Sequence, residues 1–71
     1  MKANYVLINI KEVTRRLCMS RSSIYRRLNP NDPSYDPSFP KPVKLGDSIT
    51  RWVESEINQW LQSNLNSRKS A

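Results

Sequence analysis

Histidine is absent from the 71-residue chain, and cysteine and glycine occur once each. With Cys18 as the only thiol, no Cys/His set for zinc and no internal disulfide can form. No base stands near Cys18 in the sequence to activate it, and we predict a small core residue there. Glu54 and Glu56 would point to different sides of a helix, which excludes a close carboxylate pair. We therefore expect no enzyme activity, no metal and no cofactor.

Long apolar runs are also missing. No segment approaches the roughly 18 residues that a membrane-spanning helix needs. The apolar stretch at residues 5–8 is too short for the hydrophobic region of a signal peptide. We therefore expect a cytoplasmic protein without membrane contact, and a reducing compartment also suits the single cysteine.

Positive charge is what the chain has in excess. Twelve Lys and Arg stand against six Asp and Glu, which gives a formal net charge of +6. This imbalance favours polyanionic partners, with nucleic acid first and an anionic membrane second, and the sign alone does not choose between them. A single domain of this size buries a modest fraction of its surface, so we expect a binding surface rather than a deep cavity.

A first helix is predicted over residues 10–18. Asn9 and Glu12 have the spacing of a capping box, in which side chains bond the free backbone groups of the first turn. Apolar side chains then recur at helical intervals, and basic residues lie off that stripe. The segment is therefore expected to turn one face to the core.

A second helix is predicted over residues 21–28. Ser20 is a suitable N-cap, Ile24 and Leu28 form an apolar pair one turn apart, and Pro30 prevents the helix from continuing. Only about two residues separate this helix from the first. So short a link is typical of a helix-turn-helix, whose second helix is commonly presented to DNA, although any helical hairpin would fit the same spacing.

A connector, a β-hairpin and a third helix are predicted downstream. All five prolines fall within residues 30–42, which favours a rigid connector over a proline-rich ligand for another protein. Alternating residues around a glycine-containing turn predict a hairpin over residues 43–52. Acidic residues then open a helix predicted over residues 54–65. We expect a single domain over residues 1–65 and a flexible tail over residues 66–71.

The aromatic residues are assigned mainly to the core. Trp60 lies on the apolar stripe of the third helix, and a domain this small needs large side chains such as Trp52 and Trp60 inside it. Stacking of these tryptophans on the bases of a single strand is the alternative. Tyr35 and Phe39 are expected to attach the connector to the body.

The outward face of the second helix has the residues of a DNA-contacting surface. With the apolar pair turned to the core, a helical wheel places Ser22 and Arg26 on the opposite side, with Ser23 and Tyr25 beside them. Arginine can bond guanine through two donors, and hydroxyls can bond bases or phosphates. No acidic residue occurs within residues 20–28, whereas a helix built only for solubility usually mixes charges.

The hairpin adds basic residues beside this helix. Two helices, a ribbon and a third helix predict a mainly α fold with a small β-hairpin, a winged helix-turn-helix of three helices plus a wing. Two basic residues on a hairpin are ordinary by themselves, and Asp47 at its tip would repel a close phosphate, so the hairpin matters only together with the helix. The predicted DNA-binding residues are Arg21, Ser22, Ser23, Tyr25, Arg26, Arg27, Lys41, Lys44, Ser48 and Arg51.

Three segments in this order, "SRSSIYR", "FPKPVKLG" and "RWVESEINQWL", give the chain a resemblance to a known family. Over residues 7–61 it resembles the AlpA family of small phage and mobile-element DNA-binding regulators, which is related to the excisionases and more remotely to MerR-type winged helices. The resemblance implies that "SRSSIYR" is the recognition helix and "KLGDS" the wing, with Trp52, Ile57 and Trp60 in the core. Two features depart from the family: Cys18-Met19 stands where glycine is often found, and "NPNDPSYDPS" is longer than the usual linker.

The resemblance implies a double-stranded DNA-binding transcription regulator of a prophage or integrated element. Helix 21–28 would enter the major groove, and the wing, residues 43–52, would lie on the backbone or in the minor groove. The alternatives are an excisionase that bends attachment-site DNA, or an inhibitor that contacts a regulator or recombinase without binding DNA. RNA is a further alternative. Integrase and RNA polymerase are candidate protein partners, and we expect a monomer in solution with several copies side by side on DNA.

Overall fold

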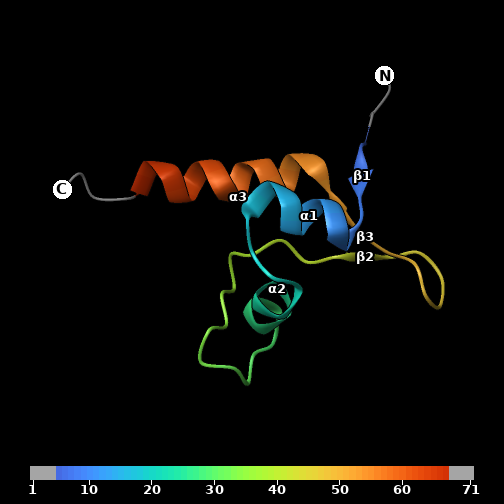
Figure 1. Ribbon diagram of the computed structural model, residues 1–71, viewed down its shortest axis with the longest axis horizontal. Coiled ribbons are helices and arrows are strands. Elements are labelled where there is room, and N and C mark those ends of the chain that lie inside the picture. The colour runs from blue at the N-terminus through green and yellow to red at the C-terminus, as the bar shows by residue number, and fades with distance from the viewer. Residues whose placement is uncertain (1–4, 68–71) are drawn as a thin grey trace.

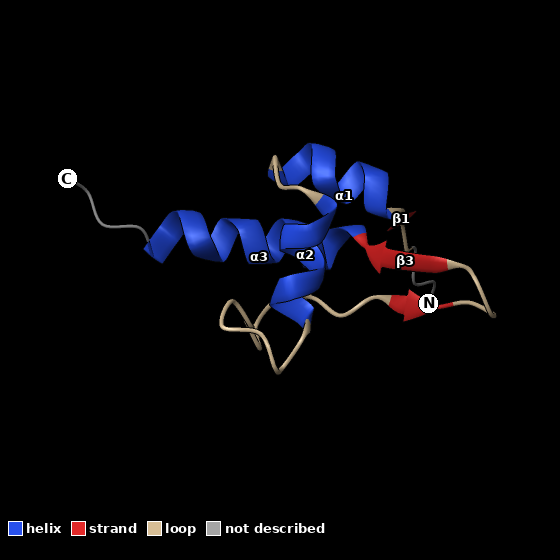
Figure 2. Cartoon of the chain, turned by 60° about the horizontal axis from the view of Figure 1, so that its bottom comes forward, coloured by secondary structure: helices blue, strands red, loops and turns tan. Residues whose placement is uncertain are grey.

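A computed structural model describes residues 5–67 of the chain. Within them, the elements in chain order are β1 (Leu7–Ile8), α1 (Ile10–Leu17), α2 (Arg21–Leu28), β2 (Val43–Lys44), β3 (Thr50–Val53) and α3 (Glu54–Ser67). The strands form an antiparallel sheet in the order β1-β3-β2. The β2–β3 hairpin projects away from the helices at one end of the molecule, and α3 extends at the other (Figures 1 and 2). This is the predicted winged helix-turn-helix.

The first helix begins as predicted and ends one residue earlier. The Asn9 side chain accepts a hydrogen bond from the Glu12 N–H at 2.9 Å, which confirms the N-cap. At the other end Cys18 has φ 53° and ψ 41°, the left-handed conformation that commonly closes a helix. The Cys18 side chain is exposed, so its prediction as a core residue was wrong.

Nearly every segment contributes one buried apolar side chain to the core. Its buried members are Ile8, Val13, Ile24, Phe39, Trp52 and Ile57, with Leu28 and Trp60 among the partly buried side chains packed against it. Trp52 is fully buried and its indole N–H donates to the Pro40 carbonyl at 3.2 Å. The assignment of Trp52 to the core is therefore confirmed, and α2 is attached to the body through Ile24, as predicted.

The connector is fixed to the body at Asp36 and Phe39. One carboxylate oxygen of Asp36 accepts from the Ser38 N–H and hydroxyl, and the other accepts from the Trp60 indole N–H at 3.2 Å. These hydrogen bonds, the Ser38 hydroxyl first, hold the pKa of Asp36 below its usual value. The Phe39 ring meets the Trp60 ring edge-on, with centroids 4.9 Å apart. Tyr35 stays exposed, so Phe39 alone of the two predicted anchors is buried.

The sheet and the third helix differ from the prediction at their edges. The strand β1 was not predicted; its Leu7 and Ile8 pair with Val53 and Trp52 of β3. The helix α3 continues two residues past Leu65, which is exposed rather than packed. The remaining residues of the predicted tail, 68–71, lie outside the described residues. No helix within residues 5–67 is both long and apolar enough to cross a membrane.

Candidate nucleic-acid interface

The start of α2 is closed by its N-cap. The Ser20 side chain accepts a hydrogen bond from the Ser23 N–H at 3.1 Å, while the Ser20 backbone is extended, as expected for an N-cap. The two serine hydroxyls also bond each other at 3.1 Å. The hydroxyl of Ser23 is therefore engaged in the cap, and the side chain is half-buried. Of the serines predicted to contact DNA on this helix, Ser22 is the exposed one.

The exposed side of α2 is slightly hollowed. Five residues line this depression, which has a volume of about 360 Å³: Arg21, Ser22, Tyr25, Arg26 and Asn29. We call these five residues the α2 face. Four of them were predicted to contact DNA, and Asn29 was missed. Asn29 lies one helical turn after Tyr25, and this spacing was the signal available in the sequence.

Tyr25 connects the α2 face to the core. Its ring lies 6.3 Å from that of Trp52, at an interplanar angle of 59°. This distance is within the range in which aromatic pairs attract each other. Tyr25 is 42% exposed and Trp52 is fully buried, so the Tyr25 ring faces solvent on one side and contacts a core residue on the other. The pair therefore restricts how α2 can shift against the wing.

The α2 face has no carboxylate to neutralise it. Within residues 5–67, every ion pair belongs to one cluster on α1 and α3, in which Glu12 contacts Arg15 and Arg16, and Arg16 contacts Glu54 at 2.8 Å. Hydrogen bonds from Arg15 and then Arg16 lower the pKa of Glu12 to about 2. In the same part of the chain Arg21 and Arg26 have no carboxylate within 4.0 Å. Their charges are thus available to an external anion.

Arg27 is directed away from the α2 face. Its guanidinium donates to the Ser23 carbonyl at 3.1 Å, and the side chain is half-buried. Its positive charge also contributes to the low pKa of Asp36 in the connector. The structure therefore separates Arg27 from the other arginines of α2, in a position suited to holding the connector against the helix.

The predicted residues of the wing do not share one surface. Val43 pairs with Arg51, and Lys44 with Thr50, so Lys44 and Arg51 lie on opposite faces of the hairpin. Lys44 is exposed on the face that also carries Trp52, which is the side of α2. Arg51 is half-buried and donates to the Thr50 carbonyl at 2.9 Å. Lys44 is therefore the wing cation placed nearest to the α2 side.

Two further predicted residues lie outside both surfaces. Ser48 is exposed in the turn that follows Gly46, whose φ of 96° is one that glycine adopts readily. Lys41 is exposed at the end of the connector and borders a groove beside α3 rather than the α2 face. The arrangement offers one concave cationic face on a helix, with one exposed wing cation, Lys44, on the same side of the hairpin.

Comparison with known proteins gives two matches. Residues 6–65 match the family described as "Prophage CP4-57 regulatory protein (AlpA)". The chain is also 40% identical over 55 residues to the "DNA-binding transcriptional activator AlpA" of Escherichia coli (strain K12), an alignment that covers 78% of this chain and 79% of that protein. No solved structure matches significantly. The matched span covers all six elements up to the last turn of α3, and it confirms the resemblance: the chain belongs to the AlpA family.

Proposed function

We propose that this protein is a double-stranded DNA-binding transcription regulator of a prophage or integrated element. The observation that carries the proposal is the α2 face, where two arginines without carboxylate partners among residues 5–67 flank hydroxyl and amide groups. The name of the Escherichia coli relative, a DNA-binding transcriptional activator, supports the same function. In this proposal α2 enters the major groove and the wing lies on the backbone or in the minor groove.

Individual residues of the α2 face have distinct roles in the proposal. Arg26 is placed to bond guanine through two donors, and Asn29 has the amide that suits adenine. The exposed N–H groups at the start of α2, beside Arg21, attract a phosphate. Tyr25 adds a hydroxyl on a ring that Trp52 holds in place. Lys44 binds the backbone beside the groove.

Salt dependence gives a first test of the backbone contacts. About five phosphate contacts would make the affinity fall roughly as the fourth to fifth power of the salt concentration. Fluorescence anisotropy with labelled duplex at several salt concentrations measures this slope. A wild-type protein that binds no duplex even at low salt would contradict the proposal and favour the alternative of a protein-contact inhibitor.

Base reading is tested on a site found by footprinting DNA that flanks the gene's own locus. Arg26→Ala should cost about 1–3 kcal/mol on that site and much less on random duplex. Arg15→Ala is the matched control, because it removes the same charge from an exposed residue of α1. Equal losses on both duplexes would leave Arg26 with a backbone role only. Lys44→Ala should weaken both duplexes alike and reduce the salt slope by about one unit.

The same footprint separates regulation from excision. Protection at a promoter supports a transcription regulator. A row of direct repeats beside an attachment site would instead support an excision factor that bends DNA.

A further inference from the structure

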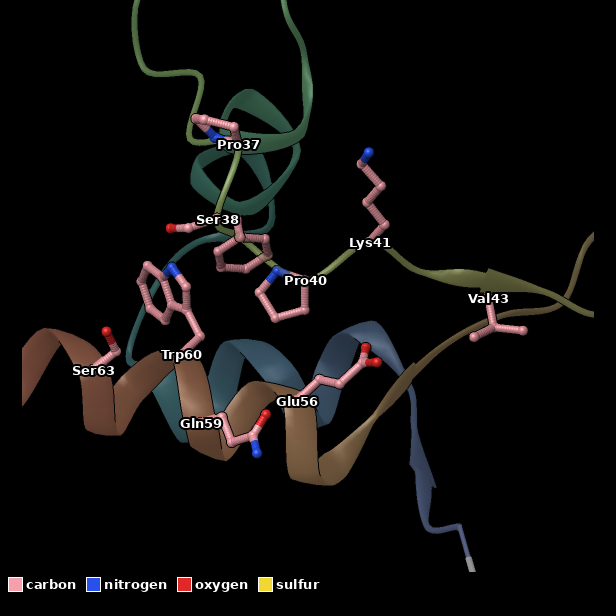
Figure 3. Close-up of a pocket in the computed structure, with 10 residues that line it drawn as sticks. Pro37, Ser38, Pro40, Lys41, Val43, Glu56, Gln59, Trp60 and Ser63 are labelled. Carbon is pink, nitrogen blue, oxygen red and sulfur yellow. The ribbon is translucent and has the colours of Figure 1, made fainter.

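A second concave surface lies between α3 and the connector. Phe39, Pro40, Val43 and Trp60 give it apolar walls, and Glu56, Gln59 and Ser63 of α3 add polar groups. Its volume is about 620 Å³, within the roughly 300–1,000 Å³ typical of ligand pockets. Figure 3 shows Trp60 rising from α3 on one side, with Pro40 and Lys41 of the connector on the other. We call it the α3 groove. It shares no residue with the α2 face, so DNA binding as proposed leaves it open.

The wing tip, residues 45–49, has two exposed apolar side chains and no basic residue. Leu45 and Ile49 are 44% and 45% exposed, and the Leu45 N–H donates to the Ile49 carbonyl at 2.8 Å. Paired residues of a hairpin share a face, so the two side chains form one apolar knob, on the face opposite Lys44. Asp47 is exposed beside it. Burial of these two side chains against another apolar surface would be favourable.

We propose that the wing tip of one copy of this protein docks in the α3 groove of a second copy bound next to it on DNA. Leu45 and Ile49 would pack against Trp60 and Pro40, and Asp47 would approach Lys41. The apolar knob matches the apolar walls of the groove, and Asp47 would meet Lys41 on the connector side, while Glu56 lies on the α3 side (Figure 3). The proposal rests on the DNA-binding function proposed above.

The contact is between copies because the fold prevents it within one copy. Val43 lines the α3 groove, and the hairpin leads away from Val43 to its tip, so the tip cannot return to its own groove (Figures 1 and 2). Knob and groove are different surfaces, which makes the contact heterologous and allows a row of copies. The longest dimension of the chain is 42 Å, comparable to the roughly 34–36 Å of one DNA turn.

DNA is needed for this contact to form. Each copy has a net charge of +6, so two copies repel each other in solution until DNA neutralises them. The knob and groove involve only a few side chains, against about 20–30 residues on each side of a stable interface. Such a small contact becomes effective when both copies are held at high local concentration on one duplex. The consequence is cooperative DNA binding by a protein that is monomeric in solution.

A charge exchange between the two surfaces tests the contact. The affinity of the protein is measured for a short random-sequence duplex that holds one copy and for a duplex about three times as long. The difference between the two affinities gives the cooperativity. Asp47→Lys and Lys41→Asp should each reduce cooperativity, because like charges then meet. The double variant, and an equal mixture of the two single variants, should restore it. The short duplex corrects for any change in the DNA affinity of one copy.

The apolar part of the contact has its own variant. Ile49→Thr keeps a β-branched residue in the hairpin and should lower cooperativity about tenfold, and the short duplex again corrects for any change in the DNA affinity of one copy. Leu65→Ala is the matched control, because Leu65 is 42% exposed and does not line the groove. If wild type binds the short duplex but cooperativity is absent, or is the same in Ile49→Thr, the contact between copies is refuted and the proposed function stands. If wild type binds neither duplex, the proposed function itself fails.

Discussion

The arginines of α1 and α2 have the same chemistry and opposite surroundings. In α1, Arg15 and Arg16 are held by Glu12, and Arg16 also by Glu54 of α3. In α2, Arg21 and Arg26 line an exposed depression with no acidic residue on their helix. Both helices are eight residues long, so the difference comes from the carboxylates and not from the length. Arginine density alone therefore does not distinguish the two helices; the presence or absence of carboxylate partners within residues 5–67 does.

The largest effect is expected when α2 is given the carboxylate that α1 has. Ser22→Glu places an acid four residues before Arg26, the spacing of a helical ion pair. It would neutralise Arg26 and repel phosphates, so DNA affinity should fall at least about tenfold. The acid lies in the first turn, where it suits the helix dipole, so stability should not fall. Anisotropy and thermal melting measure the two effects.

Ser22→Gln is the control for that variant, because it adds similar bulk without the charge. If both variants lose affinity equally, bulk and not charge is responsible. A Ser22→Glu protein that keeps wild-type affinity would contradict the role given to the unpaired charges of α2.

The opposite change removes the carboxylate from α1. Glu12→Gln removes the acid that pairs with Arg15 and Arg16. Only the ion pair between Arg16 and Glu54 then remains in the cluster. Thermal stability should fall by a few degrees, while binding to random duplex is unchanged or slightly stronger because Arg15 loses its carboxylate partner and Arg16 keeps only Glu54. Glu56→Gln is the control, because it removes an exposed acid from α3 that takes part in none of these ion pairs. A Glu12→Gln protein with wild-type melting temperature would show that the cluster does not stabilise the fold.

The pH dependence of stability follows from the same group. The folded protein holds the pKa of Glu12 at about 2, against an ordinary value of 4.5, so the ionised form is favoured by folding. Its contribution is fully present above pH 4.5 and is lost as the pH falls from 4.5 toward 2. Urea unfolding between neutral pH and pH 3 should therefore show a smaller loss of stability in Glu12→Gln than in wild type. Equal pH dependence in both proteins would refute this linkage.

The helices and the wing were predictable because their signals are local. Asn9 and Ser20 cap the helices that follow them, and Pro30 stands just beyond the end of α2. Gly46 supplies the positive φ of the hairpin turn. Each signal acts within a few residues, so the sequence carries it directly.

The missed features depend on contacts between distant segments or on backbone conformation. The strand β1 exists because Leu7 and Ile8 meet β3 more than forty positions later, which periodicity does not reveal. Arg27 was predicted to contact DNA; its half-buried position beside the connector near Asp36 is set by the fold, and a helical wheel does not reveal it. The groove between α3 and the connector likewise arises only when Trp60 and Pro40 are brought together.

The smallest effect is expected at the turn that joins the two helices. Cys18 adopts φ 53°, a conformation that costs a side-chain-bearing residue roughly 1–2 kcal/mol and costs glycine almost nothing. Glycine also loses more freedom on folding, by about 0.5–1 kcal/mol, so Cys18→Gly should stabilise the protein by about 0.5–1 kcal/mol. Cys18→Ala removes the exposed thiol but keeps the strain, and should leave stability unchanged. Equal urea midpoints for the two variants would mean that the strain in the turn only offsets the extra freedom that glycine loses, and a lower midpoint for Cys18→Gly would mean that the turn is not strained. DNA affinity should be the same in both because the α2 face is untouched.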